Sequence, residues 1–327
     1  MKSIRFFLVV LVLIFGTGCA GKSDIRLAGP GQDVELTATP FFPQKKYQCG
    51  PAALAMLLGA SGVAVRPDDL APVTYLPDRQ GSLQVEMMAA CRQSGRIPFL
   101  IPRDISGLIA EIQSGRPVLV LQNFGFEWWP VYHYAVVIGM RYPDRLVLRS
   151  GTRKRVEMAT DRFNRTWERA GSWGMISLHP GDLPRNIDQR DYLNAVAAFE
   201  SAGNAITAAA AYRTARGVWP DNPAVLFALA NNHLRNDEPA QAAAHYRTLL
   251  AADPNHVAAA NNLAEALVRQ DDLDEALAVI QTAVETAERI QSPLLEVIQQ
   301  TRLEIKQALQ RVSIEPGKPL DREDGSW

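Results

Sequence analysis

The chain has 327 residues, of which 47% are hydrophobic and 21% charged. This composition is that of a folded protein with room for two modest domains, and it excludes a disordered or fibrous chain. The formal net charge is -1, so no excess of positive charge is present to bind nucleic acid or an anionic membrane surface. The three cysteines cannot form a disulfide framework, and each needs its own explanation.

The N-terminus has the pattern of an export signal, which we assign to residues 1–18. A basic start and an apolar run at 6–15, too short to span a bilayer, are followed by small residues and Cys19. This resembles a bacterial lipobox, although Gly16 stands where most lipoboxes have Leu. Acylation of Cys19 would then anchor the chain on a membrane. Ala20 resembles the sorting pattern of outer-membrane lipoproteins that face the periplasm. Plain secretion and a retained signal anchor are the alternatives.

Residues 19–38 are polar and predict a tether, and residues 39–180 predict a first domain in which helices and strands alternate. The expected helices lie at 51–58, 83–94 and 105–114, and the expected strands at 97–101, 118–121, 134–140 and 146–149. A Tyr-Pro-Asp turn at 142–144 joins the last two strands and predicts a hairpin. Helices followed by a mostly antiparallel sheet indicate an α+β fold.

A segment with Pro and Gly at 181–188 is the predicted linker, after which the sequence is Ala-rich and repeats every 34 residues. Two sets of residues are in register: Ala208, Ala242 and Ala276, and then Tyr212, Tyr246 and Ile280. This resembles a tetratricopeptide array. The resemblance implies an all-α solenoid over 189–311, capped by an amphipathic helix, and a protein-binding surface on it. Residues 312–327 are an expected flexible tail. A generic helical bundle is the alternative, which the constant period disfavours.

The strongest chemical motif surrounds Cys49, which directly precedes an apolar helical run. At a helix N-terminus, backbone N–H groups and the helix dipole stabilise a thiolate. Gly50 leaves room for a substrate backbone, and Pro51 is tolerated in a first turn. The helix N-terminus also offers a donor to an oxyanion, and Gln44 upstream can supply a second one. These features predict an activated nucleophile. An inert buried thiol is the alternative.

The partner base is expected among five histidines. Three of them belong to the repeats and His179 borders the linker, whereas His133 alone begins an apolar strand. A strand end can hold an imidazole within reach of a helix end across a cleft, as a thiol–imidazole pair requires. His133 is therefore the predicted base, with a merely packed histidine as the alternative.

The two motifs together resemble the bacteriocin-processing, double-glycine-leader branch of the papain-like cysteine peptidases, over residues 41–178. The resemblance is carried by Gln44, by Cys49-Gly50-Pro51-Ala52 and by His133-Tyr134-Ala135-Val136-Val137. It implies a papain-like fold, peptide-bond hydrolysis, a Cys49 nucleophile, a His133 general base and a Gln44 oxyanion donor. Gln44 lies five residues before the cysteine, where relatives usually have six, so Gln48 remains a lesser candidate.

The chain departs from this family at the third catalytic position. The family places an Asp, followed by Pro, at the end of the strand after the His strand, and Ser150 stands there in this chain. A hydroxyl can orient an imidazole but cannot stabilise imidazolium as a carboxylate does. Asp144, in the preceding turn, lies too early in the chain to replace it. We therefore include Ser150 as the candidate third member.

Other reactive or charged residues have simpler interpretations. Cys91 lies on an amphipathic helix and is expected in the core, although a disulfide to Cys49 would abolish the nucleophile. Trp128 and Trp129 line the substrate cleft or belong to the core. A cationic group is interpreted as a solvated hairpin face, with acidic-peptide binding as the alternative; it comprises Arg149, Arg153, Lys154 and Arg155. No spaced metal-ligand set or Gly-rich phosphate loop is visible, so neither a metal nor a cofactor is expected.

The sequence thus predicts a lipid-anchored envelope cysteine peptidase whose repeats recruit a peptide or protein substrate, or a partner protein. An export system is one candidate partner, because the relatives process exported peptides. Two alternatives remain open. A non-catalytic peptide-binding module is favoured by the missing carboxylate at Ser150, and an acyl transferase or amidase would use the same pair. Nucleic acid is not an expected partner.

Overall fold

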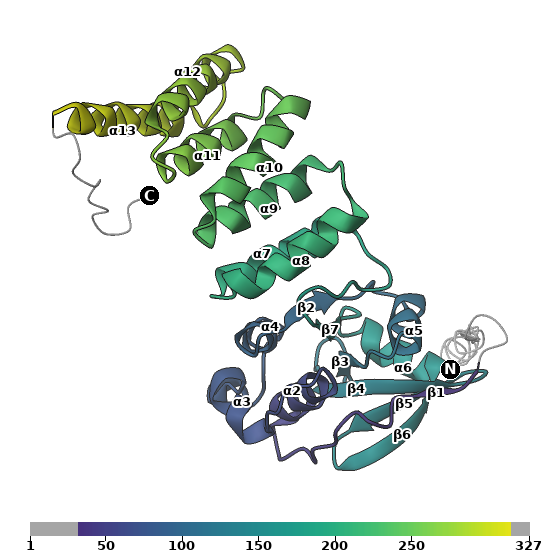
Figure 1. Cartoon of the computed structure of the whole chain (residues 1–327). Coiled ribbons are helices and arrows are strands. Elements are labelled where there is room, and N and C mark those ends of the chain that lie inside the picture. Colours follow the sequence, from purple (N-terminus) through teal and green to yellow (C-terminus); the bar gives the residue numbers. More distant parts are fainter. Residues whose placement is uncertain (1–31, 315–327) are drawn as a thin grey trace, which may run out of the picture.

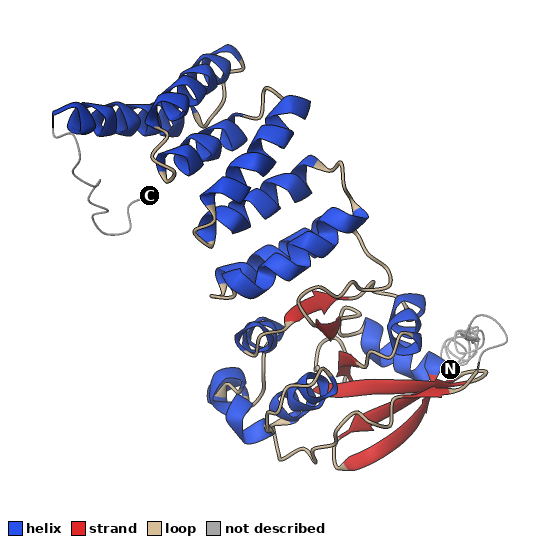
Figure 2. Cartoon of the chain, in the orientation of Figure 1, coloured by secondary structure: helices blue, strands red, loops and turns tan. Residues whose placement is uncertain are grey.

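The computed structural model describes residues 32–314, so Cys19, the signal segment and most of the tether lie outside the described residues. The chain forms a sheet-containing domain followed by a row of helices (Figures 1 and 2). The predicted fold class, an α+β domain followed by an all-α array, is confirmed. Within the described residues, no helix combines the length and the hydropathy that a membrane span needs.

A single antiparallel sheet forms the centre of the first domain. Its strands are β1 (Val34–Glu35), β2 (Ile97–Leu100), β3 (Val118–Asn123), β4 (Tyr132–Arg141), β5 (Arg145–Ser150), β6 (Arg153–Ala159) and β7 (Gly174–Leu178). Six of them follow the order β2-β7-β3-β4-β5-β6, and β1 pairs with the far end of β4. Every residue of β3 is buried, because helices cover both faces of the sheet at that point.

The helices of this domain are α2 (Cys49–Ala60), α3 (Pro67–Thr74), the 3₁₀ turn η1 (Pro77–Arg79), α4 (Gln84–Gln93), α5 (Ile105–Gln113) and α6 (Thr160–Glu168). Helices α2, α3 and α4 share one core on one face of the sheet, where α2 packs directly on β4, on the side of Tyr134, Val136 and Ile138. Helices α5 and α6 pack on the other face, against Ala135 and Val137. Alternate residues of β4 therefore belong to two different cores.

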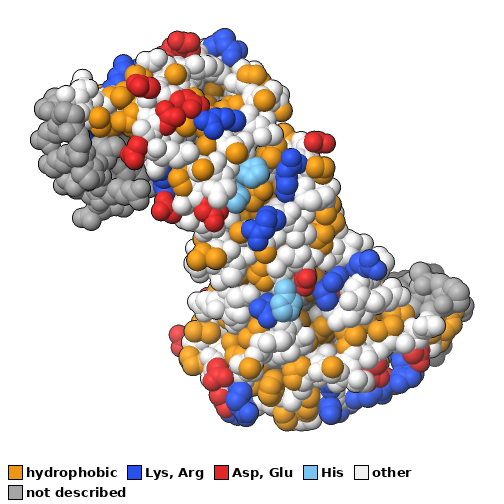
Figure 3. All heavy atoms as spheres, in the orientation of Figure 1, with side chains coloured by type: hydrophobic (Ala, Val, Ile, Leu, Met, Phe, Trp, Pro, Cys, Tyr) orange, Lys and Arg blue, Asp and Glu red, His pale blue; other side chains and the backbone are white. Residues whose placement is uncertain are grey.

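All seven expected helices and strands of this domain are present, with ends shifted by a few residues. The sequence did not predict α3, η1, β6, α6, β7 or the short strand β1, which lies within the expected tether. Part of the interpretation of the cationic group is wrong. Arg149 is only 3% exposed, and its guanidinium donates to the carbonyl oxygens of Lys154 and Thr37. The three other cations lie exposed on β6, where Figure 3 shows a row of Lys and Arg along the lower edge.

The C-terminal array consists of α7 (Gln189–Ser201), α8 (Ala205–Val218), α9 (Pro223–Arg235), α10 (Pro239–Ala252), α11 (Val257–Val268), α12 (Leu273–Arg289) and α13 (Leu295–Ile314). The residues in register with a period of 34 are buried where consecutive helices cross: Ala208, Ala242, Ala276, Tyr212, Tyr246 and Ile280. Small alanines allow the helix pairs to approach closely, and the larger side chain one turn later fills the space beside them.

The first repeat packs directly against the sheet domain. One continuous core joins Ile97 and Phe99 of β2 to Tyr192, Val196 and Phe199 of α7. Helix α7 thus packs on β2, the strand at one end of the sheet.

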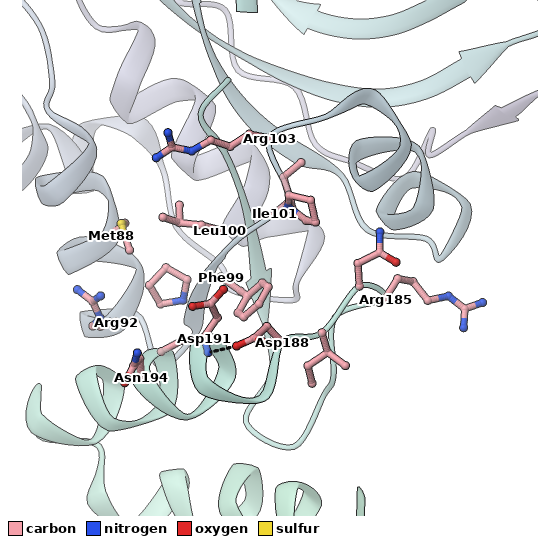
Figure 4. Close-up of a pocket in the computed structure, with 15 residues that line it drawn as sticks. Met88, Arg92, Phe99, Leu100, Ile101, Arg103, Arg185, Asp188, Asp191 and Asn194 are labelled. Atoms are coloured by element: carbon pink, nitrogen blue, oxygen red, sulfur yellow. Dashed lines mark hydrogen bonds between the residues drawn. The ribbon is translucent and has the colours of Figure 1, made fainter. Parts of the chain in front are cut away.

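A buried carboxylate on α5, that of Glu111, adds polar contacts to this junction. It accepts from Arg116 Nε at 2.6 Å and from the backbone N–H of Arg185 at 2.7 Å. A cavity of about 1030 Å³ lies beside the contact, between α4, β2 and the start of α7 (Figure 4). The reactive residues predicted from the sequence are not among those that line it.

Candidate functional site

Cys49 is the first residue of α2, at the end of the sheet where β4 begins. The residues from Gly50 to Leu58 are all buried, because the sheet, α3 and α4 surround α2, whereas the segment before Cys49 is more polar and more exposed. Gly50 has no room for a side chain, since a Cβ there would lie 2.3 Å from Ser82 Oγ. The cysteine therefore sits, partly exposed, at the mouth of an otherwise buried helix.

The surroundings of the Cys49 sulfur both raise and lower its pKa. Burial has the largest effect and raises the pKa of the thiol above its ordinary value. The backbone N–H groups of Tyr134, Gly50 and Cys49 itself act in the opposite direction. The sequence predicted a stabilised thiolate, and the structure instead favours a neutral thiol at rest. The N–H groups that face the sulfur remain the feature that stabilises the thiolate once it forms.

His133 is the second residue of β4, and its Nε2 lies 2.9 Å from Ser150 Oγ at the end of β5. Burial lowers the pKa of His133, and no carboxylate contributes to its shift. The imidazole is therefore neutral near neutral pH. Its ring also contacts Phe124, with ring centroids 5.8 Å apart. Asp144 lies at the other end of β5, so Ser150 alone occupies the position predicted from the sequence.

The Gln44 side chain is fixed by two contacts with the backbone. Its Nε2 donates to the carbonyl oxygen of Tyr134 at 3.1 Å, and its Oε1 accepts from the N–H of Gly151 at 3.1 Å. The amide nitrogen carries a second N–H besides the one that Tyr134 accepts. Gln48 precedes α2 as its N-cap residue, and its Oε1 is buried without a hydrogen-bond partner among the described residues.

The candidate residues lie at one end of the sheet, around the peptide unit that joins His133 to Tyr134. The Cys49 sulfur faces the N–H of Tyr134, Gln44 binds the carbonyl of Tyr134, and His133 binds Ser150. Side chains alternate along β4, so the Tyr134 ring lies on the α2 side, where its hydroxyl donates to Ser82 O. The His133 ring lies on the side of Ser150 and Phe124.

Cys91 behaves as the sequence predicted for a core thiol. It is fully buried on α4, 3.9 Å from Ser177 Oγ, and burial raises the pKa of its thiol to about 12. Cys49 and Cys91 are both free thiols, so the disulfide considered as an alternative is not formed. Within the region from 32 to 314, no group of three or more His, Cys, Asp or Glu side chains is arranged to hold a metal ion.

Comparison with known families matches two segments of the chain. Residues 36–175 match the Peptidase_C39 like family, and residues 227–293 match the tetratricopeptide repeat. The chain carries a Peptidase_C39-like domain followed by tetratricopeptide repeats. The first match contains all four residues of the candidate site, from Gln44 to Ser150. The resemblance drawn from the Cys49 and His133 motifs is thereby confirmed at the level of the family.

The solved structures that resemble the chain include two tetratricopeptide proteins. The Sgt2 TPR domain from Aspergillus fumigatus is 17% identical, with 43% of this chain and 92% of that chain covered and a TM-score of 0.37. A thermophilic TPR protein from Thermus thermophilus, TTC0263, is 20% identical, with 39% and 69% covered and a TM-score of 0.34. No curated protein matches the chain.

Proposed function

We propose that the Peptidase_C39-like domain hydrolyses peptide bonds, with Cys49 as nucleophile and His133 as general base. The observation that carries the proposal is the position of Cys49 at the mouth of α2, beside the N–H of the residue that follows His133. The contact of His133 Nε2 with Ser150 Oγ leaves Nδ1 as the ring nitrogen that can take up the thiol proton.

The reaction starts from a neutral pair, because burial raises the pKa of Cys49 and lowers that of His133. Transfer of the thiol proton to His133 accompanies attack of the sulfur on the scissile carbonyl carbon. The developing oxyanion accepts hydrogen bonds from the N-terminal N–H groups of α2 and from the second N–H of Gln44. The imidazolium then protonates the leaving amine, and water hydrolyses the thioester with His133 again as the base. Ser150 orients the ring and supplies no charge.

Cleavage of a peptide mixture, followed by mass spectrometry, tests this proposal. We expect Cys49→Ala and His133→Ala to abolish cleavage. Matched controls are Cys91→Ala, which removes the buried thiol, and His179→Ala, which removes an exposed imidazole. Cleavage that survives in the Cys49→Ala variant would exclude the proposed nucleophile, and products joined to a new acceptor would indicate an acyl transferase instead.

A peptide-binding module without activity is the second candidate function, and one observation favours it. Ser150 supplies a hydroxyl where the family has a carboxylate, so the imidazolium has no negative charge beside it. Cys49 alkylation separates the two functions. If His133 acts as the base, replacing it lowers the alkylation rate of Cys49. If Cys49 is an inert thiol, the rate is the same in the wild type and in the His133 variant.

We also propose the finer features predicted from the sequence. Acylated Cys19 anchors the protein at the outer membrane, facing the periplasm, and the repeats bind a protein partner, for which an export system is one candidate. Mass spectrometry of the mature N-terminus tests the anchor, since acyl chains add a defined mass to Cys19. An unmodified Cys19, or an uncleaved signal, would exclude it. Cross-linking in cells, with and without residues 189–311, tests the partner.

A further inference from the structure

The loop between β3 and β4 carries an unusual concentration of exposed apolar side chains. This aromatic loop, residues 124–131, leads directly into Tyr132 and His133. Its exposed large apolar residues, with the first residue of β4, are Phe124, Phe126, Trp128, Trp129, Val131 and Tyr132. Trp128 is 79% and Trp129 is 69% exposed, although tryptophan is ordinarily well buried. Exposed apolar patches of this kind mark binding surfaces.

The aromatic loop is held in a defined conformation by hydrogen bonds at its base. The side-chain oxygen of Asn123 accepts from the N–H groups of Gly125 and Val131, each at 2.9 Å. The guanidinium of Arg169, which follows α6, donates twice to the carbonyl oxygen of Asn123. The exposure of the rings is therefore built into the fold, and binding a ligand would order few additional groups.

Further contacts fix the tip of the loop. Phe126 and Trp129 exchange backbone hydrogen bonds at 3.1 and 3.2 Å, and the rings of Phe126 and Trp128 stack with centroids 5.5 Å apart. A side chain at Gly125 would lie 2.2 Å from the carbonyl oxygen of Trp129, so only glycine allows this closure. The aromatic loop thus presents a preformed apolar surface.

This surface is continuous with the candidate catalytic residues. The Phe124 ring lies 5.8 Å from the His133 ring, and Tyr132 directly precedes His133. On the Cys49 side, Tyr47 is a further exposed aromatic, 44% exposed and two residues before the cysteine. An extended peptide advances about 3.3 to 3.6 Å per residue, so Phe124 is within about two residues of a bond held at His133.

The charge of the aromatic loop limits what can bind there. Glu127 is the only ionisable residue from 124 to 131, and it lies between two exposed rings. A negative charge among the rings disfavours contact with an anionic lipid surface. It is compatible with a peptide that places large apolar side chains against the rings and leaves its polar backbone in water.

From these observations we infer that the aromatic loop selects peptides with aromatic or large aliphatic side chains close to the scissile bond. The inference rests on the proposed peptidase function and names the substrate class of the same site. Phe124 contacts the apolar side chain nearest to the scissile bond, and Trp128 and Trp129 contact the next one along the peptide. These three residues determine specificity and take no part in the chemical step.

The test compares paired peptides that carry Phe or Leu, or else Ser, at each position around the cleaved bond. In the full-length protein we expect kcat/KM to favour the apolar peptide. The double variant Trp128→Ala/Trp129→Ala should lower that preference about tenfold or more, which is the range for losing an apolar contact of this size. Trp129→Phe should retain most of the preference. Ile206→Ala, an 82% exposed apolar residue on α8, is the matched control and should not change it.

Binding to the Cys49→Ala variant separates this inference from the proposed function. If the wild-type protein cleaves nothing but Cys49→Ala binds apolar peptides through Trp128 and Trp129, the peptidase proposal fails and the inference stands. If cleavage occurs and the double variant keeps the same preference, the inference is wrong. Binding to vesicles of phosphatidylcholine with phosphatidylglycerol tests whether the aromatic loop binds a lipid surface instead. Vesicle binding lost in the double variant, with unchanged peptide preference, would assign the aromatic loop to a lipid surface and overturn the inference.

Discussion

Replacing Ser150 with Asp should convert the neutral pair into one that ionises more readily. The Ser150 hydroxyl lies 2.9 Å from His133 Nε2, and an aspartate there would place a carboxylate against the same nitrogen. An opposite charge at this separation shifts a pKa by about 1 to 3 units, here upward for His133, against the lowering that burial causes.

The magnitude follows from the balance between the two neutral groups and the ion pair. Each unit by which the His133 pKa rises increases the ratio of the thiolate–imidazolium pair to the neutral pair tenfold, so a rise of 1 to 3 units gives about 10- to 1000-fold. A less basic thiolate is also a weaker nucleophile, which offsets about half of this gain on a logarithmic scale. We therefore expect Cys49 in Ser150→Asp to be alkylated about 3 to 30 times faster near neutral pH.

The assay measures the rate of iodoacetamide alkylation of Cys49 between about pH 5 and 9, a range that contains the ordinary pKa values of His and Cys. Peptide-level mass spectrometry separates Cys49 from Cys91 and Cys19. The wild-type rate should rise with pH up to and beyond the ordinary thiol pKa, because burial raises the pKa of Cys49. Ser150→Asp should shift the rise to lower pH.

Ser150→Asn is the matched control, because it has the size of aspartate without the charge. Its profile should resemble that of the wild type. Identical profiles for Ser150→Asp, Ser150→Asn and the wild type would refute the reasoning, since they would show that the His133 imidazole is not coupled to the Cys49 sulfur.

Three further predictions concern stability and are measured by thermal and chemical unfolding. Glu111→Gln leaves buried partners without their carboxylate and should destabilise by about 3 kcal/mol. Asp68→Asn removes one charge of an exposed pair with Lys45 and should leave stability nearly unchanged; equal effects of the two variants would contradict this. Phe199→Ala should cost about 3 to 5 kcal/mol and destabilise both domains together, as hydrogen exchange would show, because their core is shared. Gly125→Ala should destabilise by about 1 to 3 kcal/mol, because the added Cβ would clash with the carbonyl oxygen of Trp129. Gly217→Ala on α8 should be neutral or stabilising, because a Cβ there has no atom within 4 Å. Similar values for both variants would exclude the steric argument.

Local sequence patterns determined most of what surrounds the candidate site. The apolar runs after Cys49 and after His133 are long and uninterrupted, so a buried helix beginning near the one and a buried strand beginning near the other could be expected from the sequence. The repeats were equally visible, since a constant period of 34 residues with small residues in register admits few other folds. Placing His133 and Ser150 side by side needed only the hairpin between β4 and β5.

Tertiary structure decided features that no local pattern contains. Strand β7 lies between β2 and β3, although it follows them by more than fifty residues, because pairing between distant segments depends on the whole sheet. Arg149 is buried since Thr37 and Lys154 accept its hydrogen bonds, and only folding brings Thr37 to it. The neutral state of the Cys49 thiol also depends on tertiary packing. A helix N-terminus favours a thiolate locally, but the packing of α2 on the sheet removes water from the sulfur, and desolvation outweighs the nearby N–H groups.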